Sequence, residues 1–275
     1  MHIKNDIPSL SIVIPTLNEA RNIRHVLAVL PADAEIVIVD GRSTDGTIEA
    51  ALSLRPDAVI VKQTRKGKGN ALACGFSASS GDIIVMLDAD GSADPGEIDS
   101  FVSALLLGAD YAKGSRFCAG GGSSDITRFR RIGNSALNFL VNVLIGSRFT
   151  DLCYGYNAFW RHCLPALELD PGPRGTVKHW GDGFEVETLI NMRVALAGLR
   201  IVEVPSYEHG RIHGVSNLNA FSDGARVLRT IFGEARRPGR KRLIAQPRSH
   251  PLLGHQITPP PHQRSPAAGR AEASI

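Results

Sequence analysis

The most constraining feature of the sequence is an apolar run, residues 83–87, that leads directly into two aspartates, Asp88 and Asp90. A continuous apolar run between glycine-containing turns is typical of a central parallel strand covered on both faces. Ligands of such sheets bind beyond the carboxyl ends of the strands, where both aspartates fall. Because side chains alternate along an extended backbone, both carboxylates are expected on one side, as hard oxygen ligands for a divalent cation that bridges phosphates. The alternative is a solvated acidic turn.

Three earlier segments repeat this pattern of an apolar run followed by a polar loop. The expected strands are 10–15, 35–40 and 58–61, and the expected helices are 22–30, 47–54 and one that begins at the glycine-rich loop 67–69. This alternation predicts an α/β fold with a parallel, doubly wound sheet and right-handed crossovers. The loops that follow the strands then converge on one edge of the sheet, beside Asp88.

Charge is unevenly distributed along the chain. Of its 275 residues, 43% are hydrophobic and 21% are charged, which is enough apolar content for one large core or two modest ones. Residues 236–275 contain eight Arg and Lys but a single acid, which leaves 1–235 with 23 basic and 26 acidic residues and a net charge of −3. We therefore predict a folded domain, 1–235, and a basic, proline-rich disordered tail, 236–275. Nucleic-acid binding is not expected. The tail is a solubilising or linking extension, or it contacts anionic lipid headgroups.

No targeting or membrane-spanning segment is expected. The first ten residues lack the apolar stretch of a signal peptide. The best candidate for a membrane span, 136–145, is too short and contains Asn138 and Asn142. The four cysteines show no metal-ligand spacing, and we interpret them as reduced residues of a cytoplasmic protein.

The loops at the predicted sheet edge suit a nucleoside diphosphate. Asp40 ends a strand and can accept a hydrogen bond from a base or a ribose. Gly41 and Gly46 allow close backbone approach, and Lys68 offers a cation to phosphate. The alternative for Lys68 is a solvated loop lysine. Neither the P-loop pattern nor G-x-G-x-x-G is present after the first strand, which disfavours a P-loop NTPase and a dinucleotide dehydrogenase.

Four motifs in this order resemble those of family 2 glycosyltransferases of the GT-A fold. They are I-V-I-P-T-L-N-E at 12–19, V-D-G-R-S-T-D-G-T at 39–47, G-K-G-N-A at 67–71 and L-D-A-D-G at 87–91. The resemblance implies a Rossmann-like, mostly parallel central sheet flanked by helices. It also implies that four residues border the base and ribose of a nucleotide sugar: Pro15, Leu17, Glu19 and Asp40. Asp88 and Asp90 would hold Mg²⁺ or Mn²⁺ on the diphosphate, where the metal neutralises charge on the departing group.

The second half of the chain is similar to the polyprenol (dolichol) phosphate mannosyltransferase branch of this family. The matching segments are K-G-S-R-F at 113–117, 128–134, D-L-C-Y-G-Y-N at 151–157 and R-I-H-G-V-S-N at 211–217. Arginines of that branch help to hold phosphates, and the matching positions are Arg116 and Arg131. The resemblance places Arg211 and Ser216 close to the donor and acceptor phosphates.

Two departures from this branch affect the acceptor side. Asn217 stands where the branch usually has lysine, and Cys153 or Tyr154 stands where it usually has serine. The first departure removes a cation from the expected acceptor site. His213 is a candidate to replace part of that charge, although a histidine in a loop is more often an ordinary hydrogen-bonding residue.

The acceptor decides which side chains the chemistry needs. An acceptor phosphate is already anionic and needs cations, which Arg131, Arg211 and the neighbouring residues Arg128, Arg130 and His213 would supply. A hydroxyl acceptor needs a general base, for which Asp182 and Glu185 are the candidates, followed by Glu187. The expected catalytic residues are therefore Asp182, Glu185, Arg131 and Arg211. The alternative for the three acids is a helix N-terminus, where carboxylates are favoured.

Together these features predict a metal-dependent, inverting glycosyltransferase that moves a hexose of the mannose or glucose type from a GDP- or UDP-sugar to polyprenyl phosphate. Inversion is implied by the family alone. With such an acceptor, the apolar segment 136–145 would lie in the membrane interface at the inner face of the plasma membrane; otherwise it packs on the sheet or forms a dimer contact. Two alternatives stay open: the same donor used on the hydroxyl of a soluble acceptor, and a non-catalytic nucleotide-sugar-binding protein.

Overall fold

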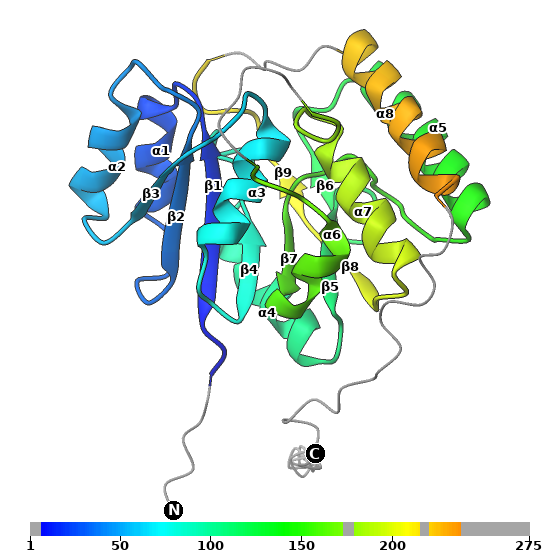
Figure 1. The fold of residues 1–275 in the computed structure, drawn as a ribbon, viewed down its shortest axis with the longest axis horizontal. Helices are drawn as coiled ribbons and strands as arrows, with labels where there is room; N and C mark the ends of the chain where they lie inside the picture. Colours follow the sequence, from blue (N-terminus) through cyan, green and yellow to red (C-terminus); the bar gives the residue numbers. More distant parts are fainter. Residues whose placement is uncertain (1–6, 173–178, 215–219, 238–275) are drawn as a thin grey trace, which may run out of the picture. The chain divides into compact units, whose positions relative to one another are not determined.

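A computed structural model describes residues 7–172, 179–214 and 220–237 of the chain (Figure 1). Ser216, Asn217 and nearly all of the predicted tail lie outside the described residues. The described part contains a central mixed sheet with helices packed against it. No helix among these residues is both long and apolar enough to cross a bilayer.

The central sheet of the described residues has seven strands in the order β3-β2-β1-β4-β7-β5-β8. All neighbours run parallel except β7, which is antiparallel to both β4 and β5. Its strands are β1 (Leu10–Thr16), β2 (Glu35–Asp40), β3 (Val59–Lys62), β4 (Ile83–Met86), β5 (Tyr111–Ser115), β7 (Asn157–Trp160) and β8 (Ile201–Pro205). A second sheet joins β6 (Gly122–Ser123) to β9 (Tyr207–Glu208). The predicted α/β fold with a mostly parallel sheet is confirmed.

Helices cover the sheet and shield its apolar strands from water. They are α1 (Ala20–Leu27), α2 (Thr47–Leu54), α3 (Lys68–Ala78), α4 (Ile98–Leu106), α5 (Arg128–Ile145), α6 (Leu164–Leu167), α7 (Val186–Leu196) and α8 (Ala220–Ala235), with short 3-10 turns at Pro95–Glu97 and Arg161–Cys163. Helix α3 packs on β1, β2 and β3, and α4 packs on β5 and β7. The residues of β4 are all buried, as a strand covered on both faces requires.

A smaller apolar cluster joins the helices of the second half. Val141 of α5, Met192 of α7 and Ile231 of α8 are fully buried in it. The ribbon shows α8 and α5 side by side next to α7 (Figure 1). Because α8 contributes buried side chains up to its last turn, residues up to Ala235 belong to the folded unit.

The segment after β4 differs from its prediction. The strand ends at Met86, and Asp90 lies in a turn rather than on an extended backbone. Gly91 has a φ of 75°, a conformation that glycine adopts without strain. The two aspartates therefore reach the sheet edge from a turn, and the alternation rule for strands does not set their directions.

Candidate active site

Two ion pairs lie at the carboxyl edge of the sheet beside β4. The Nζ atom of Lys68 lies 2.7 Å from an Asp88 oxygen, and the guanidinium of Arg211 lies 3.2 Å from an Asp90 oxygen. Arg211 also donates to Glu19 over 2.8 Å. The structure thus brings together five of the predicted site residues, which come from the ends of β1 and β4, from α3 and from the loop after β9.

Glu187 completes this cluster from the first turn of α7. Its carboxylate lies 2.6 Å from the ammonium of Lys68 and is 5% exposed. Burial raises the pKa of Glu187, although the charge of Lys68 opposes that shift. Burial alone would lower the pKa of Lys68, but Asp88 and Glu187 outweigh it and hold this pKa above the usual value. Lys68 is therefore a charged, bridging cation and not a solvated loop lysine.

Gly155 keeps space open above this cluster. A Cβ atom at this position would lie 3.0 Å from the Lys68 ammonium and 3.2 Å from a Glu187 oxygen. A second close approach lies in the first turn of α3, where the backbone N–H of Gly69 donates to the carbonyl of Asp182 over 2.9 Å. A Cβ at Gly69 would collide with the Gly181 carbonyl oxygen, so this glycine serves packing against the loop before α7.

Backbone hydrogen bonds hold the Arg211 loop against the aspartate turn. The N–H of His209 donates to the Ser92 carbonyl over 2.8 Å, and the N–H of Ile212 donates to the Asp90 carbonyl over 3.2 Å. These bonds fix Arg211 beside Asp90. Desolvation lowers the pKa of His213, as do Arg21 and His25, so the structure disfavours a charged imidazole as the replacement for the missing cation.

The predicted base and ribose contacts lie at the ends of β1 and β2. Leu17 is exposed, Pro15 is half-buried and Asp40 is buried. Asp40 accepts hydrogen bonds from the N–H groups of Arg42 over 2.9 Å and of Ser43 over 3.2 Å. Asp40 thus shapes the loop after β2 in addition to any ligand contact.

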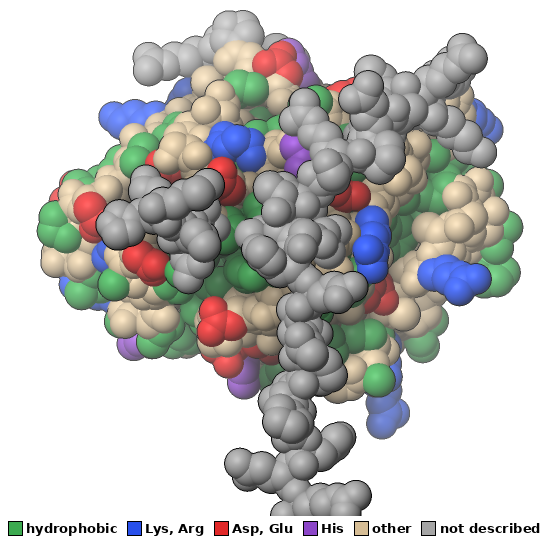
Figure 2. All heavy atoms as spheres, turned by 90° about the horizontal axis from the view of Figure 1, so that it is seen from below, with side chains coloured by type: hydrophobic (Ala, Val, Ile, Leu, Met, Phe, Trp, Pro, Cys, Tyr) green, Lys and Arg blue, Asp and Glu red, His purple; other side chains and the backbone are tan. Residues whose placement is uncertain are grey.

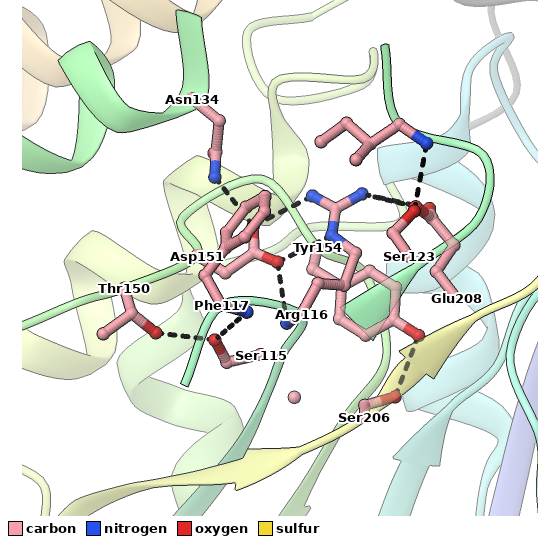
Figure 3. Close-up of polar contacts among 12 residues, drawn as sticks. Ser115, Arg116, Phe117, Ser123, Asn134, Thr150, Asp151, Tyr154, Ser206 and Glu208 are labelled. Carbon is pink, nitrogen blue, oxygen red and sulfur yellow. Dashed lines mark hydrogen bonds and ion pairs between the residues drawn. The ribbon is translucent and has the colours of Figure 1, made fainter. Parts of the chain in front are cut away.

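Arg116 is engaged by two carboxylates (Figure 3). Its Nε and one terminal nitrogen bind Asp151 over 2.7 and 2.9 Å, and the other terminal nitrogen lies 3.0 Å from both oxygens of Glu208. Its side chain is 9% exposed and Asp151 is fully buried. These bonds join the segment after β5 to β9 and so to the loop of Arg211, and the phosphate contact that the family resemblance implies for Arg116 stays a prediction.

Loss of the Asp151 charge is expected to destabilise this network strongly. Asp151→Asn leaves the buried Arg116 with Glu208 alone and weakens the bond from Asn134, so the free energy of unfolding should fall by about 3 kcal/mol. Urea-induced unfolding measures this change. The control is Asp125→Asn, because Asp125 forms an exposed pair of 3.8 Å with Arg130 whose loss should change stability little. Equal losses in the free energy of unfolding in the two variants would refute the structural role of the ion pair between Arg116 and Asp151.

Asp182 is also engaged by buried partners. Its two oxygens accept from Arg65 over 2.8 Å each, and one of them accepts from the N–H of His179 over 2.7 Å. Both partners of the ion pair are about 5% exposed or less. These bonds hold Asp182 in the loop before α7, and its role as a general base stays a prediction.

The two remaining predicted catalytic residues lie outside the central cluster. Glu185 is buried at the start of α7 and accepts from the N–H groups of Gly181 and Gly183 over 3.2 Å each. Arg131 is exposed in the first turn of α5, and its guanidinium lies 5.3 Å from the ring centre of Phe117. Among the described residues, no ion pair joins Arg131 to a carboxylate, so its guanidinium is available to a ligand.

The carboxylates of Asp88 and Asp90 fit a divalent cation that also binds oxygens of a ligand. No group of three or more His, Cys, Asp or Glu in the described part of the chain is placed to hold a metal alone. Asp88 and Asp90 provide two carboxylates, which are hard oxygen ligands of the kind Mg²⁺ and Mn²⁺ prefer. Diphosphate oxygens would complete such a coordination sphere. Lys68 and Arg211 neutralise the two carboxylates in the present structure.

A mostly parallel sheet with paired charges at its carboxyl edge is the architecture of nucleotide-binding α/β enzymes. The family model described as glycosyl transferase family 2 matches residues 11–164. The chain therefore belongs to glycosyltransferase family 2 and is an enzyme, which sets aside the hypothesis of a non-catalytic binding protein.

The chain is also similar to two relatives and, in its fold, to a solved protein. The chain is 30% identical over 236 residues to the undecaprenyl-phosphate mannosyltransferase of Micrococcus luteus, covering 82% of this chain and 94% of the relative. It is 30% identical over 232 residues to the polyprenol monophosphomannose synthase of Mycolicibacterium smegmatis, covering 80% and 83%. The fold is similar to that of glucosyl-3-phosphoglycerate synthase from Mycobacterium tuberculosis, solved with Mn²⁺, UDP and phosphoglyceric acid, with a TM-score of 0.64, 22% identity and coverage of 85% and 80%. A second structure of that synthase holds Mg²⁺ and UDP.

Proposed function

We propose that the chain is a metal-dependent, inverting glycosyltransferase that moves a hexose of the mannose or glucose type from a GDP- or UDP-sugar to polyprenyl phosphate. The observation that carries this proposal is the cluster of Asp88, Asp90, Lys68 and Arg211 at the carboxyl edge of the sheet. Its two carboxylates and two cations match a metal-bound diphosphate, and the two mannosyltransferase relatives support the acceptor. Inversion is taken from the family.

The proposed reaction forms a bond between an acceptor oxygen and the anomeric carbon of the hexose. The bond from that carbon to the nucleoside diphosphate breaks, and its electron pair leaves with the diphosphate. A divalent cation held by Asp88 and Asp90 would neutralise charge on this departing group. Lys68 and Arg211 lie next to the same carboxylates, so their N–H groups can turn to the phosphate oxygens when the cation replaces them. Leu17 and Asp40 would border the base and ribose.

A soluble hydroxyl acceptor is the second candidate. It is favoured by Glu187, whose buried carboxylate has a raised pKa and lies in the central cluster, where a general base would be needed. A phosphate acceptor needs no such base. Because Glu187 is also the partner of Lys68, its presence in the cluster is explained under both hypotheses.

Helix α5 supports a peripheral contact with a membrane surface. Its buried face carries Asn134 and Asn138 together with Val141, whereas Ile132, Phe139 and Val143 on the opposite face are 71%, 72% and 66% exposed. The outer face of an ordinary surface helix is polar. The helix also contains three arginines and no acid. Apolar side chains, with Arg and Lys side chains beside them, are visible at the end of the molecule that α5 and α8 occupy (Figure 2). We therefore propose a peripheral position on the anionic inner face of the plasma membrane.

A panel of substrates tests the proposed function. The full chain is incubated with GDP-mannose, GDP-glucose, UDP-glucose and UDP-galactose in the presence of Mg²⁺ or Mn²⁺, with polyprenyl phosphate in anionic vesicles or with a set of soluble sugars. Product analysis shows which donor is consumed and where the hexose goes. Transfer to the lipid phosphate is expected. Transfer to soluble hydroxyls alone would replace the leading proposal with the second candidate.

A further inference from the structure

Glu19 stands at the junction of β1 and α1, and both of its carboxylate oxygens are engaged. It is the N-cap residue of α1, yet its side chain makes no capping hydrogen bond to the helix. Instead Oε1 accepts from Nη1 of Arg211 over 2.8 Å, and Oε2 accepts from the amide of Asn22 over 2.6 Å. An acid at the start of a helix ordinarily serves the backbone N–H groups of the first turn, so this side chain has a different purpose.

Asn22, on α1, joins Glu19 to the loop that carries Arg211. The residue is 3% exposed, and its Nδ2 donates to the carbonyl of His213 over 3.0 Å as well as to Glu19. An amide nitrogen has two N–H groups, so both bonds can form at once. Arg211 and His213 lie in the loop after β9, 192 and 191 residues from these partners. Two side-chain contacts therefore fix this loop to the start of α1.

The two carboxylates next to Arg211 face different nitrogens of its guanidinium. Nη1 donates to Glu19, and Nη2 lies 3.2 Å from an oxygen of Asp90. The contact with Glu19 is the shorter one, and the Glu19 side chain is 11% exposed against 18% for Asp90. When Asp90 serves as a metal ligand, Nη2 loses its partner, whereas Nη1 keeps Glu19. The guanidinium can then stay in place while Nη2 donates to a phosphate oxygen.

We propose that Glu19 is a positioning residue, which holds Nη1 of Arg211 so that Nη2 is directed at the diphosphate of the donor. The inference rests on the proposed function. Without Glu19, Asp90 would be the one carboxylate in contact with Arg211 among the described residues, and the guanidinium would compete with a cation for it. The family resemblance implies a contact with the base or ribose for the same residue, and the two roles predict different effects on ligand binding.

Binding of nucleotides to the full chain tests this role without turnover. Glu19→Gln is expected to weaken calorimetric binding of GDP or UDP with Mn²⁺ about tenfold, because Arg211 loses its charged partner. Binding of guanosine or uridine, followed by saturation-transfer NMR, should not change, because these ligands carry no phosphate. The matched control is Glu35→Gln at the other end of β2, where the carboxylate accepts from Ser80 over 2.8 Å. This control removes the same charge and should leave all the affinities unchanged.

A double variant separates positioning from an independent contact. A positioning residue acts through the group that it positions, so Glu19→Gln combined with Arg211→Gln should bind GDP or UDP as weakly as Arg211→Gln alone. Two independent contacts would instead multiply their effects. Asn22→Ala leaves the bond between Glu19 and Arg211 but frees the loop, and it should weaken binding about threefold. This variant carries the test if the melting temperature shows that Glu19→Gln is unfolded.

Three results would overturn the role of Glu19. They are equal losses for nucleosides and nucleoside diphosphates, which would indicate a base or ribose contact, multiplied effects in the double variant, and unchanged binding of GDP and UDP in folded Glu19→Gln. The proposed function fails separately. If GDP or UDP binds with Mn²⁺ and responds to Glu19→Gln as expected, but no hexose is transferred in the substrate panel, the positioning role stands and the transfer reaction does not.

Discussion

Asp90→Ala is expected to abolish hexose transfer and the divalent-dependent part of nucleotide binding while leaving the fold intact. Two carboxylates and the diphosphate oxygens make up the proposed metal site, so loss of one carboxylate removes half of the protein's ligands. Asp90 is partly exposed and lies in a turn, and Arg211 keeps its bond to Glu19 in the variant. We therefore expect a loss of activity of at least about 10³-fold with a nearly unchanged melting temperature.

Mn²⁺ binding provides a readout of this variant that does not depend on turnover. Calorimetric titration of GDP or UDP with and without Mn²⁺ should show metal-enhanced binding in the wild type and none in Asp90→Ala. Asp99→Ala is the control, because Asp99 is an exposed acid on α4. Full activity of the wild type in the presence of a chelator would refute metal dependence.

The first half of the fold could be predicted because its signals are local. The apolar runs of β1, β2 and β4 are too long and too continuous to lie at a surface, and each is followed by a polar loop. The insertion of β7 between β4 and β5 could not be predicted in the same way. A strand of four residues has little periodicity of its own, and its antiparallel pairing depends on partners that are distant in the chain.

The residue types of the candidate site could be predicted from the sequence, but their hydrogen-bond and ion-pair partners could not. Motif resemblance identified Asp88, Asp90 and Lys68, whose positions follow directly from the end of β4 and the start of α3. The partners of Arg116 and Asp182 lie 35 and 117 residues away in the sequence, so only the folded chain reveals that both side chains are engaged. For Glu187 the sequence leaves two readings open, a general base and an ordinary acid at a helix N-terminus, and the packing of α7 against α3 is what brings it to Lys68.

The identity of the acceptor should be decided by comparing Arg131→Ala with Glu187→Gln. Arg131 is exposed and has no carboxylate partner among the described residues, so its guanidinium can bind an acceptor phosphate. A charge-assisted hydrogen bond of this kind contributes about 1.5–3 kcal/mol. With polyprenyl phosphate, Arg131→Ala should therefore lower kcat/KM about ten- to a hundredfold, while hydrolysis of the donor without acceptor changes little. Arg148→Ala, an exposed arginine beyond the other end of α5, is the control.

If the acceptor is a hydroxyl, Glu187→Gln should slow hexose transfer more than Arg131→Ala does. Loss of a general base costs about 10²–10⁴-fold in rate, and Arg131→Ala should then be mild. The pH profile separates this effect from a structural one. Because burial raises the pKa of Glu187, a base at this position loses activity as the pH falls through that raised pKa, and the glutamine variant should lack this acidic limb. With a phosphate acceptor no proton has to be removed, so Glu187→Gln should retain the wild-type profile. Two results together would reject the hypothesis of a lipid phosphate acceptor in favour of a soluble hydroxyl acceptor. The first is an Arg131→Ala enzyme that is as fast as wild type on polyprenyl phosphate. The second is a pH profile whose acidic limb disappears in Glu187→Gln.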